Sequence, residues 1–331
     1  MYRFLFLCSH FANEIYQFIS FKRRLGRDYQ AEIKILHNFD NFLFDKYSDA
    51  TYLSKEIILE WAKLRPEESD ANRKRRISCI RQFCKYLNDK GMEAWKIPER
   101  YFPYPKKYVP YIFSIEEIQR FIKALDEIPD SIQYPHRREL YRLAFQLLIC
   151  CGMRLGEVRH LRFTDYNRQD RLIKIEKSKG KNRLVVFNDY INKRFCAYID
   201  FWESYYQKGD YIFSFNRGEK PLSSFAIHNI FREILSIANI KYLGKGRGPR
   251  IHDLRHTAVV HRIRIWLMQN KDLRTLLPYF WTYLGHESYY EMAYYFHLVE
   301  EIWPKIMNNI NEVALDLIPS IPEEEDTYAY N

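Results

Sequence analysis

The sequence predicts a mainly α protein with two domains: a helical first domain and a mixed α+β second domain that contains a small β-sheet or hairpin. Three observations support this prediction. Apolar residues recur at helical spacing through the first 95 residues, prolines cluster between residues 97 and 113, and two runs rich in β-branched residues flank a short basic segment at 178–182. A chain of 331 residues also matches about two domains of ordinary size.

The first domain is expected to span residues 1–107 and to consist of helices. Apolar residues follow a helical period from Tyr29 to Tyr47. Ser54 is placed to cap a second helix, Lys55–Arg65, because its side chain can accept a hydrogen bond from the first turn. A third helix with one apolar face is expected over Asn72–Asp89. It begins with four consecutive basic residues, Arg73, Lys74, Arg75 and Arg76.

A proline-rich linker is expected between the two domains. Four prolines lie between Ile97 and Phe113, next to Lys106 and Lys107, and proline at this density stops helices. Residues 114–117, Ser-Ile-Glu-Glu, then have the pattern of a capping box that opens a new helix. The second domain is therefore expected to span residues 108–313.

The second domain combines helical and strand patterns. A buried helix is predicted over Arg137–Cys151, where Gly152 ends it. The runs Arg171–Lys177 and Arg183–Asn188 predict a β-hairpin with a basic tip, and Tyr211–Phe215 predicts one more short strand.

The remainder, Ser223–Asn311, is expected to form helices joined by loops. One of these loops, Gly244–Pro249, is rich in glycine and contains Lys245 and Arg247. An apolar stripe follows at helical spacing, which consists of Ile302, Ile306, Ile310 and Val313. Such a stripe can pack on its own domain or on a second copy of the chain. The last residues, 314–331, are acidic and are expected to be flexible.

The charge of the chain favours a polyanionic partner. Lys and Arg number 52 and Asp and Glu 42, which gives a net charge of +10. The last twenty residues contain six acids and no Lys or Arg, so the preceding 311 residues carry +16. Charge of this sign suits nucleic acid, although many basic proteins bind none.

Several classes of protein do not fit this sequence. Its apolar stretches are too short to cross a bilayer, and its six cysteines include no C-x-x-C pair. It also lacks a G-x-x-x-x-G-K-[ST] loop for nucleotide phosphates. We therefore expect a protein of the bacterial cytoplasm, associated with the nucleoid, that uses no cofactor and no metal.

Four polar segments of the second domain carry a recognisable pattern. They are G-M-R-L-G-E at 152–157, S-K-G at 178–180, H-D-L-R-H-T at 252–257 and L-G-H at 284–286, with a tyrosine nine residues after the last histidine. In this order they resemble the tyrosine recombinase family, which includes the phage integrases and Xer-like enzymes. The catalytic residues that the resemblance implies are Arg154, Lys179, His252, Arg255, His286 and Tyr295.

The chemistry of DNA cleavage explains these residue types. Guanidiniums can hold the non-bridging oxygens of a phosphodiester bidentately, and an imidazole adds a further donor. The resemblance implies that Tyr295 attacks phosphorus and forms a 3′-phosphotyrosyl link, and that Lys179 protonates the leaving 5′-oxygen. The link conserves the energy of the broken bond, so religation needs no ATP.

The resemblance also implies a fold and partners. The first domain would be a SAM-like core-binding domain that closes with the catalytic domain into a C-shaped clamp on double-stranded DNA. The protein would act as the integrase or transposase of a mobile element, as a dimer on each core site and a tetramer in synapsis. The basic residues expected to contact DNA are Arg73, Lys74, Arg75, Arg76, Lys106, Lys107, Lys181, Arg183, Lys245 and Arg247.

Some alternatives remain open from the residues alone. Lys181 competes with Lys179 for the role of acid, and Tyr294 competes with Tyr295 for that of nucleophile. His256 is interpreted as a structural hydrogen-bonding residue, and Glu157 as a buried ion-pair partner that orients the site. A topoisomerase, a telomere resolvase or an inactive DNA-binding protein could carry the same pattern. His252 and His286 are also 34 residues apart, which is longer than the common family spacing and closer to transposon-type enzymes.

Overall fold

The structure is a computed structural model of the 331-residue chain, and it separates into two compact units, Met1–Tyr108 and Val109–Asn331. The residues that it describes are 6–66, 68–103, 108–130, 132–134, 136–178, 181–202, 205, 207, 209–216, 218–244, 248–285 and 295.

The first unit is a bundle of helices, as the sequence predicted. Its helices are α1 (Ala12–Arg24), α2 (Gln30–Lys46), α3 (Lys55–Trp61) and α4 (Asp70–Asp89). Their apolar faces meet in one core, in which Phe18, Leu36, Phe39 and Phe83 are completely buried. Ser54 caps α3, since its side chain accepts a hydrogen bond from the backbone of Ile57.

Helix α3 ends earlier than predicted, at Trp61 instead of Arg65. Pro66 follows Arg65, and a residue before proline is driven away from helical backbone angles. The Arg65 guanidinium instead lies over the Trp61 ring, 4.3 Å from its centre.

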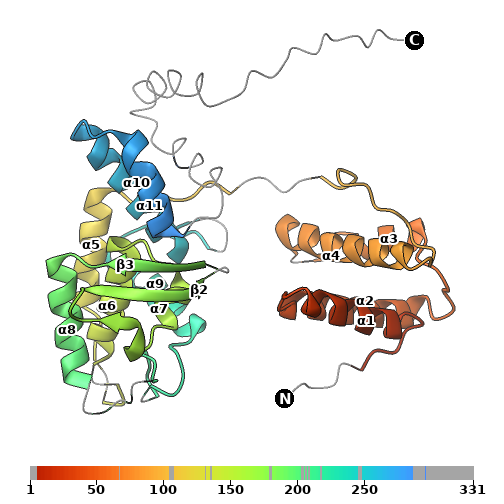
Figure 1. Cartoon of the computed structure of the whole chain (residues 1–331), viewed down its shortest axis with the longest axis horizontal. Helices are drawn as coiled ribbons and strands as arrows, with labels where there is room; N and C mark the ends of the chain where they lie inside the picture. Colours follow the sequence, from red (N-terminus) through yellow and green to blue (C-terminus); the bar gives the residue numbers. More distant parts are fainter. Residues whose placement is uncertain are drawn as a thin grey trace, which may run out of the picture. The chain divides into compact units, whose positions relative to one another are not determined.

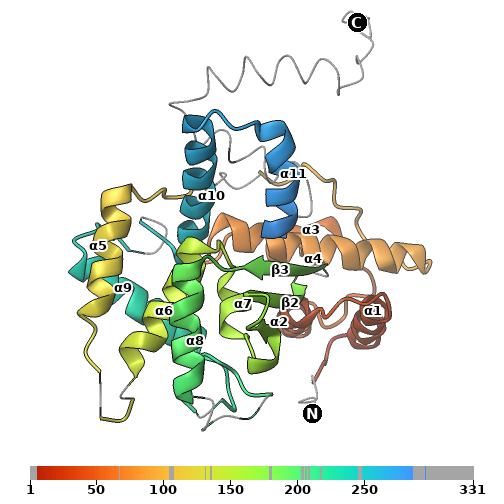
Figure 2. The ribbon, with the colours of Figure 1, turned by 60° about the vertical axis from the view of Figure 1, so that its left-hand side comes forward.

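The second unit contains most of the helices. They are α5 (Ile115–Asp126), α6 (Arg137–Cys150), α7 (Leu155–Arg159), α8 (Asp189–Trp202), α9 (Ser224–Ile237), α10 (Ile251–Met268) and α11 (Leu273–Leu284), with a 3₁₀ turn at Phe163–Asp165. Helix α6 is central, because α5, α7, α8 and α10 all pack against it (Figures 1 and 2). The predicted capping box is confirmed: Ser114 and Glu117 exchange hydrogen bonds of 2.9 and 3.1 Å at the start of α5.

A small antiparallel sheet lies beside these helices. Its strands β1 (Tyr166–Asn167), β2 (Leu172–Ser178) and β3 (Lys181–Val186) pair in the order β1-β2-β3. Strands β2 and β3 form the predicted hairpin. Ile173, Ile175 and Val185 point into the core, as alternation along a half-buried sheet requires.

The strand predicted at Tyr211–Phe215 is wrong. Tyr211 forms a single bridge to Arg162, and the residues after it do not continue a ladder. Ile212 and Phe213 are completely buried in the core of the unit. Their apolar character therefore reflects burial beneath helices and not pairing within a sheet.

The segment between Arg262 and Tyr283 accounts for the long spacing after His252. Helix α10 continues through Arg262 to Met268, and α11 returns beside it to end at Leu284 (Figure 2). The extra residues thus lie in two helices and the turn between them. Among the described residues, no helix is long and apolar enough to cross a membrane.

Candidate active site

Arg154 lies at the start of α7, where Glu157 holds both its backbone and its side chain. The Arg154 backbone N–H donates to Glu157 Oε2 at 2.7 Å, and its guanidinium donates to Glu157 Oε1 at 3.0 Å. The motif G-x-R-x-x-E therefore folds into one turn in which the carboxylate fixes the direction of the arginine. The interpretation of Glu157 as a buried ion-pair partner is confirmed, because its side chain is 5% exposed.

Arg183 on β3 is the second arginine that Glu157 holds. Its guanidinium donates to Glu157 Oε2 at 2.6 Å and also to the Tyr283 carbonyl oxygen. The Arg183 side chain is 3% exposed. Arg183 faces the same side of β3 as buried Val185 and ties the sheet to the end of α11. Its contact with DNA stays a prediction.

Arg255 on α10 is almost completely buried and points at two backbone carbonyls. It donates to the carbonyl oxygens of Gly152 and Leu284, each at 2.6 Å. Burial, and then the positive charge of Arg154, lower the pKa of the Arg255 guanidinium to about 10. It stays protonated at neutral pH, and a buried cation of this kind attracts an anion.

The end of α11 brings the two predicted catalytic arginines together. Arg154 donates to the Gly285 carbonyl at 2.6 Å, and Arg255 donates to that of the preceding residue, Leu284. The last carbonyls of a helix have no partner within the helix and carry partial negative charge, so they suit cations. A guanidinium has five N–H donors. Two of those of Arg255 donate to the carbonyl oxygens of Gly152 and Leu284.

Replacing Gly285 with alanine is expected to displace the side chains of Arg154 and Arg183. Gly285 has a φ of +65°, and an added Cβ would lie 2.8 Å from Arg183 Cδ and 3.4 Å from Arg154 Nη1. We expect a loss of about 1–2 kcal/mol from the left-handed backbone alone, together with slower DNA cleavage as the guanidiniums move. Urea denaturation and single-turnover cleavage measure the two effects.

Gly26 provides the matched control for this substitution. It has a φ of +76°, yet an added Cβ would meet nothing within 4 Å. Gly26→Ala should therefore lower stability by a similar amount and leave the cleavage rate unchanged. Equal cleavage rates in the two variants would contradict the proposed packing of Gly285 against the arginines.

Tyr295 lies next to the motif helix α10. Its side chain is 3% exposed and packs in a cluster with Val259, Val260, Ile263 and Leu284. Its hydroxyl oxygen is 2.9 Å from Nδ1 of His256, with which it forms a hydrogen bond. Tyr295 and Arg255 are also close enough for the charge of each to affect the other.

His256, whose position in the sequence suggests a structural residue, is therefore part of the candidate site. It lies one turn after His252, and the centres of the two rings are 4.7 Å apart, edge to face. Burial, and then the charges of His252 and Arg255, lower the pKa of His256 to about 3. The ring is therefore neutral at physiological pH. The four-residue spacing of two histidines on one helix was the signal that could have identified it.

Several predicted residues cannot be placed. Those that lie outside the described residues are Lys106, Lys107, Lys179, Lys245, Arg247, His286, Tyr294 and the stripe from Ile302 to Val313. For Lys181 the structure gives the backbone, at the start of β3.

The basic start of α4 separates into exposed and buried residues. Lys74 and Arg75 are exposed, Arg73 is half-buried, and Arg75 forms an ion pair with Glu32 at 3.2 Å. Arg76 is buried and is bound by Glu68 at 2.7 Å and by the Trp61 carbonyl. The charge of Arg76 is therefore neutralised inside the first unit, and its contact with DNA stays a prediction.

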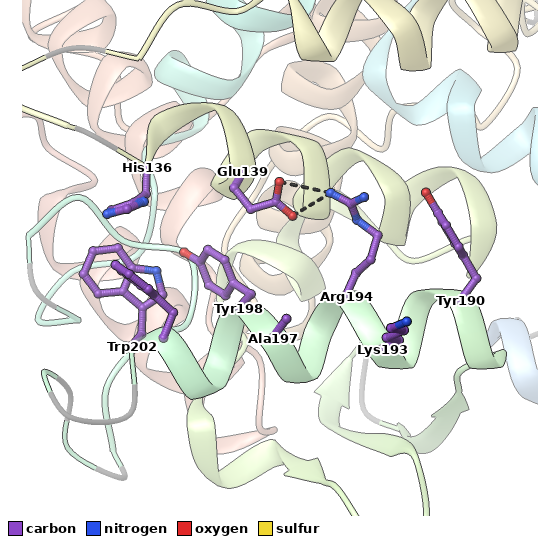
Figure 3. A pocket seen from close by; sticks show the side chains of 9 residues that line it. His136, Glu139, Tyr190, Lys193, Arg194, Ala197, Tyr198 and Trp202 are labelled. Carbon is purple, nitrogen blue, oxygen red and sulfur yellow. Dashed lines mark hydrogen bonds and ion pairs between the residues drawn. The ribbon is translucent and has the colours of Figure 1, made fainter.

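A groove between α6 and α8 lies apart from these residues (Figure 3). Its volume is about 580 Å³, and aromatic side chains such as Tyr198 and Trp202 line it. Glu139 and Arg194 face each other across it and form hydrogen bonds of 2.7 and 3.0 Å. Glu139 is near the beginning of α6, whereas the motif arginine Arg154 follows its other end. The groove therefore contains none of the motif residues.

The described residues contain no group of three or more His, Cys, Asp or Glu side chains that could hold a metal ion. The charged groups that meet at the candidate site are instead guanidiniums, with Glu157 between two of them.

Comparisons with known proteins identify the family of the chain. Residues 113–301 match the model of the phage integrase family. The protein named "Putative integrase/recombinase y4rB" from Sinorhizobium fredii is 27% identical over 315 residues, which cover 91% of this chain and 97% of that protein. Tyrosine recombinase XerC from Staphylococcus saprophyticus is 24% identical over 244 residues, 72% of this chain and 75% of that protein.

A solved structure has the same fold. It is a lambda integrase (75-356) dimer bound to a COC′ core site, with a TM-score of 0.61 and 15% identity over 86% of this chain and 94% of that one. The family model itself covers more than half of the chain, including the turn of Arg154, helix α10 and Tyr295. The protein therefore belongs to the phage integrase family.

Proposed function

We propose that this protein is a site-specific DNA recombinase that cuts and rejoins DNA through a 3′-phosphotyrosyl intermediate. The observation that carries this proposal is the convergence of Arg154 and Arg255 at the end of α11, with the Tyr295 hydroxyl close to Arg255. A phosphodiester bound by the two guanidiniums would lie within reach of a phenol nucleophile.

The chemistry follows from these groups. Charge builds up on the non-bridging oxygens as Tyr295 attacks phosphorus, and donors that are already held in place stabilise it without reorganising. The bonds of Arg154 and Arg255 to backbone carbonyls provide that preorganisation. We assign His286 as a further phosphate donor and Lys179 as the acid that protonates the leaving 5′-oxygen. His252 would donate to the phosphate or receive the proton of the Tyr295 hydroxyl.

The partner that we propose is double-stranded DNA, and the first unit offers a surface for it. A groove of about 440 Å³ lies between α2 and α4. Its lining includes the basic and amide side chains Lys34, Asn38, Asn72 and Arg75, and also Trp61, Glu68 and buried Arg76. Cationic groups suit phosphates and amides suit base edges. We propose that both units hold the duplex as a clamp, with dimers on core sites and tetramers in synapsis. The host process would be integration or transposition of a bacterial mobile element.

The test is the formation of a covalent protein–DNA adduct without metal. Core sites would be selected from a randomised DNA pool by binding, and a nicked duplex of the selected sequence would trap the cleaved strand. We expect a denaturation-resistant adduct in EDTA. A topoisomerase-like enzyme would relax supercoiled plasmid but exchange no strands between two sites. Sequence-specific binding with no adduct would favour an inactive DNA-binding protein.

A sulfur-substituted substrate is expected to identify the acid. Lys179→Ala should cleave an ordinary phosphodiester about 10²–10⁴-fold more slowly, the usual contribution of a positioned acid. A 5′-bridging phosphorothiolate has a leaving group that needs no proton, so it should restore the rate of Lys179→Ala and not that of Arg154→Ala. Lys181→Ala is the matched control. If the phosphorothiolate restores the cleavage rate of Lys181→Ala and not that of Lys179→Ala, the acid is Lys181.

A further inference from the structure

The hydrogen bond between Tyr295 and His256 connects the candidate nucleophile to a residue that the family motif leaves without a role here. The two atoms, Tyr295 Oη and His256 Nδ1, are 2.9 Å apart, and their rings are tilted with centres 5.4 Å apart. Tyr295 is almost completely buried, so the direction of its hydroxyl is set by such contacts. This inference rests on the proposed function, because it concerns the residue that would attack DNA.

We propose that His256 is a positioning residue for the nucleophile: its neutral imidazole accepts the hydrogen of the Tyr295 hydroxyl at Nδ1 and thereby fixes the direction in which the phenol oxygen presents its lone pairs. An acceptor suits this position better than a donor. A donor would occupy a lone pair that has to attack phosphorus, whereas an acceptor holds the hydrogen and leaves the lone pairs free.

The surroundings of His256 keep the imidazole in the accepting state. Two groups with positive or potential positive charge lie around it: Arg255 is its neighbour on α10, and His252 is one turn away. Together with burial they disfavour a proton on His256, which supports the role of acceptor. His256 would then hold the hydroxyl before attack, and the proton that leaves as the phosphotyrosyl bond forms would go to another base, for which we assign His252 one turn away.

The position of His256 on α10 explains how it is itself held. Leu254 and Arg255 beside it are buried, and Arg255 is fixed by the carbonyls of Gly152 and Leu284. Thr257, the next residue, donates from its hydroxyl to the Asp253 carbonyl and accepts the backbone N–H of Phe113. The same helix turn therefore places a phosphate-binding guanidinium and the acceptor for the phenol.

Three substitutions at residue 256 separate the role of hydrogen-bond acceptor from that of packing alone. Asparagine places an acceptor oxygen near the position of Nδ1, glutamine places its amide nearer that of Nε2, and leucine removes the polar atoms but keeps most of the volume. On a nicked duplex at saturating concentration, we expect His256→Leu to form the adduct about 10²-fold more slowly, the cost of a misplaced reacting group. DNA affinity should be unchanged, His256→Asn should recover most of the rate, and His256→Gln should not.

His261 is the matched control, since it is a half-buried histidine on the same helix whose ring interacts with the backbone at Phe113. His261→Leu should leave the cleavage rate unchanged. If His256→Leu fails to fold, the comparison of the Asn and Gln variants still decides the matter. Equal rates in those two variants, or a wild-type rate in His256→Leu, overturn the proposal.

A spectroscopic measurement on the free protein tests the direction of the hydrogen bond. With ¹⁵N-labelled histidine, we expect His256 to be neutral with its proton on Nε2, and its Nδ1 resonance to move in Tyr295→Phe. A proton on Nδ1 overturns the proposal while leaving the proposed function intact. A wild-type protein that forms no adduct on any selected DNA overturns the proposed function, and with it the role of His256.

Discussion

Tyr295→Phe is expected to abolish the covalent protein–DNA adduct while leaving DNA affinity unchanged. The substitution removes the attacking oxygen and keeps the ring, so packing against Val259, Val260 and Leu284 remains. Loss of a nucleophile lowers a rate by about 10⁴-fold or more. The lost hydrogen bond to His256 should cost only about 1 kcal/mol of stability. Denaturing electrophoresis of the trapped complex, with a binding titration on the same duplex, measures both quantities.

Tyr294→Phe is the matched control, because it differs from the first variant by one position. If both residues belong to one helix, their side chains point about 100° apart, so only one of the two phenols can take the place next to His256. We expect wild-type adduct formation in Tyr294→Phe. An adduct that persists in Tyr295→Phe and disappears in Tyr294→Phe would show that the nucleophile is the earlier tyrosine.

Most of the architecture could be predicted because it depends on local patterns. Helical spacing of apolar residues identified α2, α4 and α6, a serine identified the start of α3, and β-branched runs identified the hairpin of β2 and β3. Strand β1 has two residues, too few for any periodicity to be seen. The error at Tyr211–Phe215 has another cause, since a short apolar run looks the same whether it pairs in a sheet or is buried beneath helices.

Burial of individual charged residues was harder to predict. Arg75 and Arg76 are adjacent in the sequence, yet the first is exposed and the second buried. A signal was present: Arg76 is four residues before buried Ile80 and therefore lies on the apolar face of α4. Arg183 likewise lies on the inner face of β3, two residues before buried Val185. In each case the basic side chain suggests an exposed residue, whereas the periodicity indicates a position that faces the core.

The chemistry of the site could be predicted in part. Motif spacing singled out Arg154 and Arg255, and the structure brings them to consecutive carbonyls at the end of α11. The partner of Tyr295 could not be predicted in this way. His252 and His256 share one helix face, and which of them meets the phenol depends on how the chain returns after α11, a tertiary contact with no local signature.

Glu157→Gln is expected to lower the free energy of unfolding of the second unit by about 3–5 kcal/mol, the cost of leaving a buried charge without its partner. The Arg183 and Glu157 side chains are 3% and 5% exposed and are joined at 2.6 Å. Glutamine keeps the shape and one acceptor oxygen but removes the charge that both Arg154 and Arg183 require. Urea denaturation followed by circular dichroism measures the loss.

An exposed ion pair of the same unit provides the comparison. Arg168 and Asp200 are also 2.6 Å apart, but their side chains are 55% and 46% exposed. Asp200→Asn should cost less than about 1 kcal/mol, because water replaces the lost partner. The double variant Glu157→Gln with Arg183→Met should be more stable than Glu157→Gln alone, since it removes the buried charge together with its partner.

Glu157→Gln should also increase the affinity of the site for anions. The charges of Arg154 and Arg183 disfavour the protonated form of Arg255, whereas Glu157 favours it, so removal of Glu157 leaves three guanidiniums in mutual repulsion. An oxyanion that binds the native protein stabilises it by mass action. Sulfate should therefore recover more stability in Glu157→Gln than in Asp200→Asn, which reports the general effect of the salt. Equal recovery in the two variants would mean that the arginines around Glu157 do not form a phosphate-binding site.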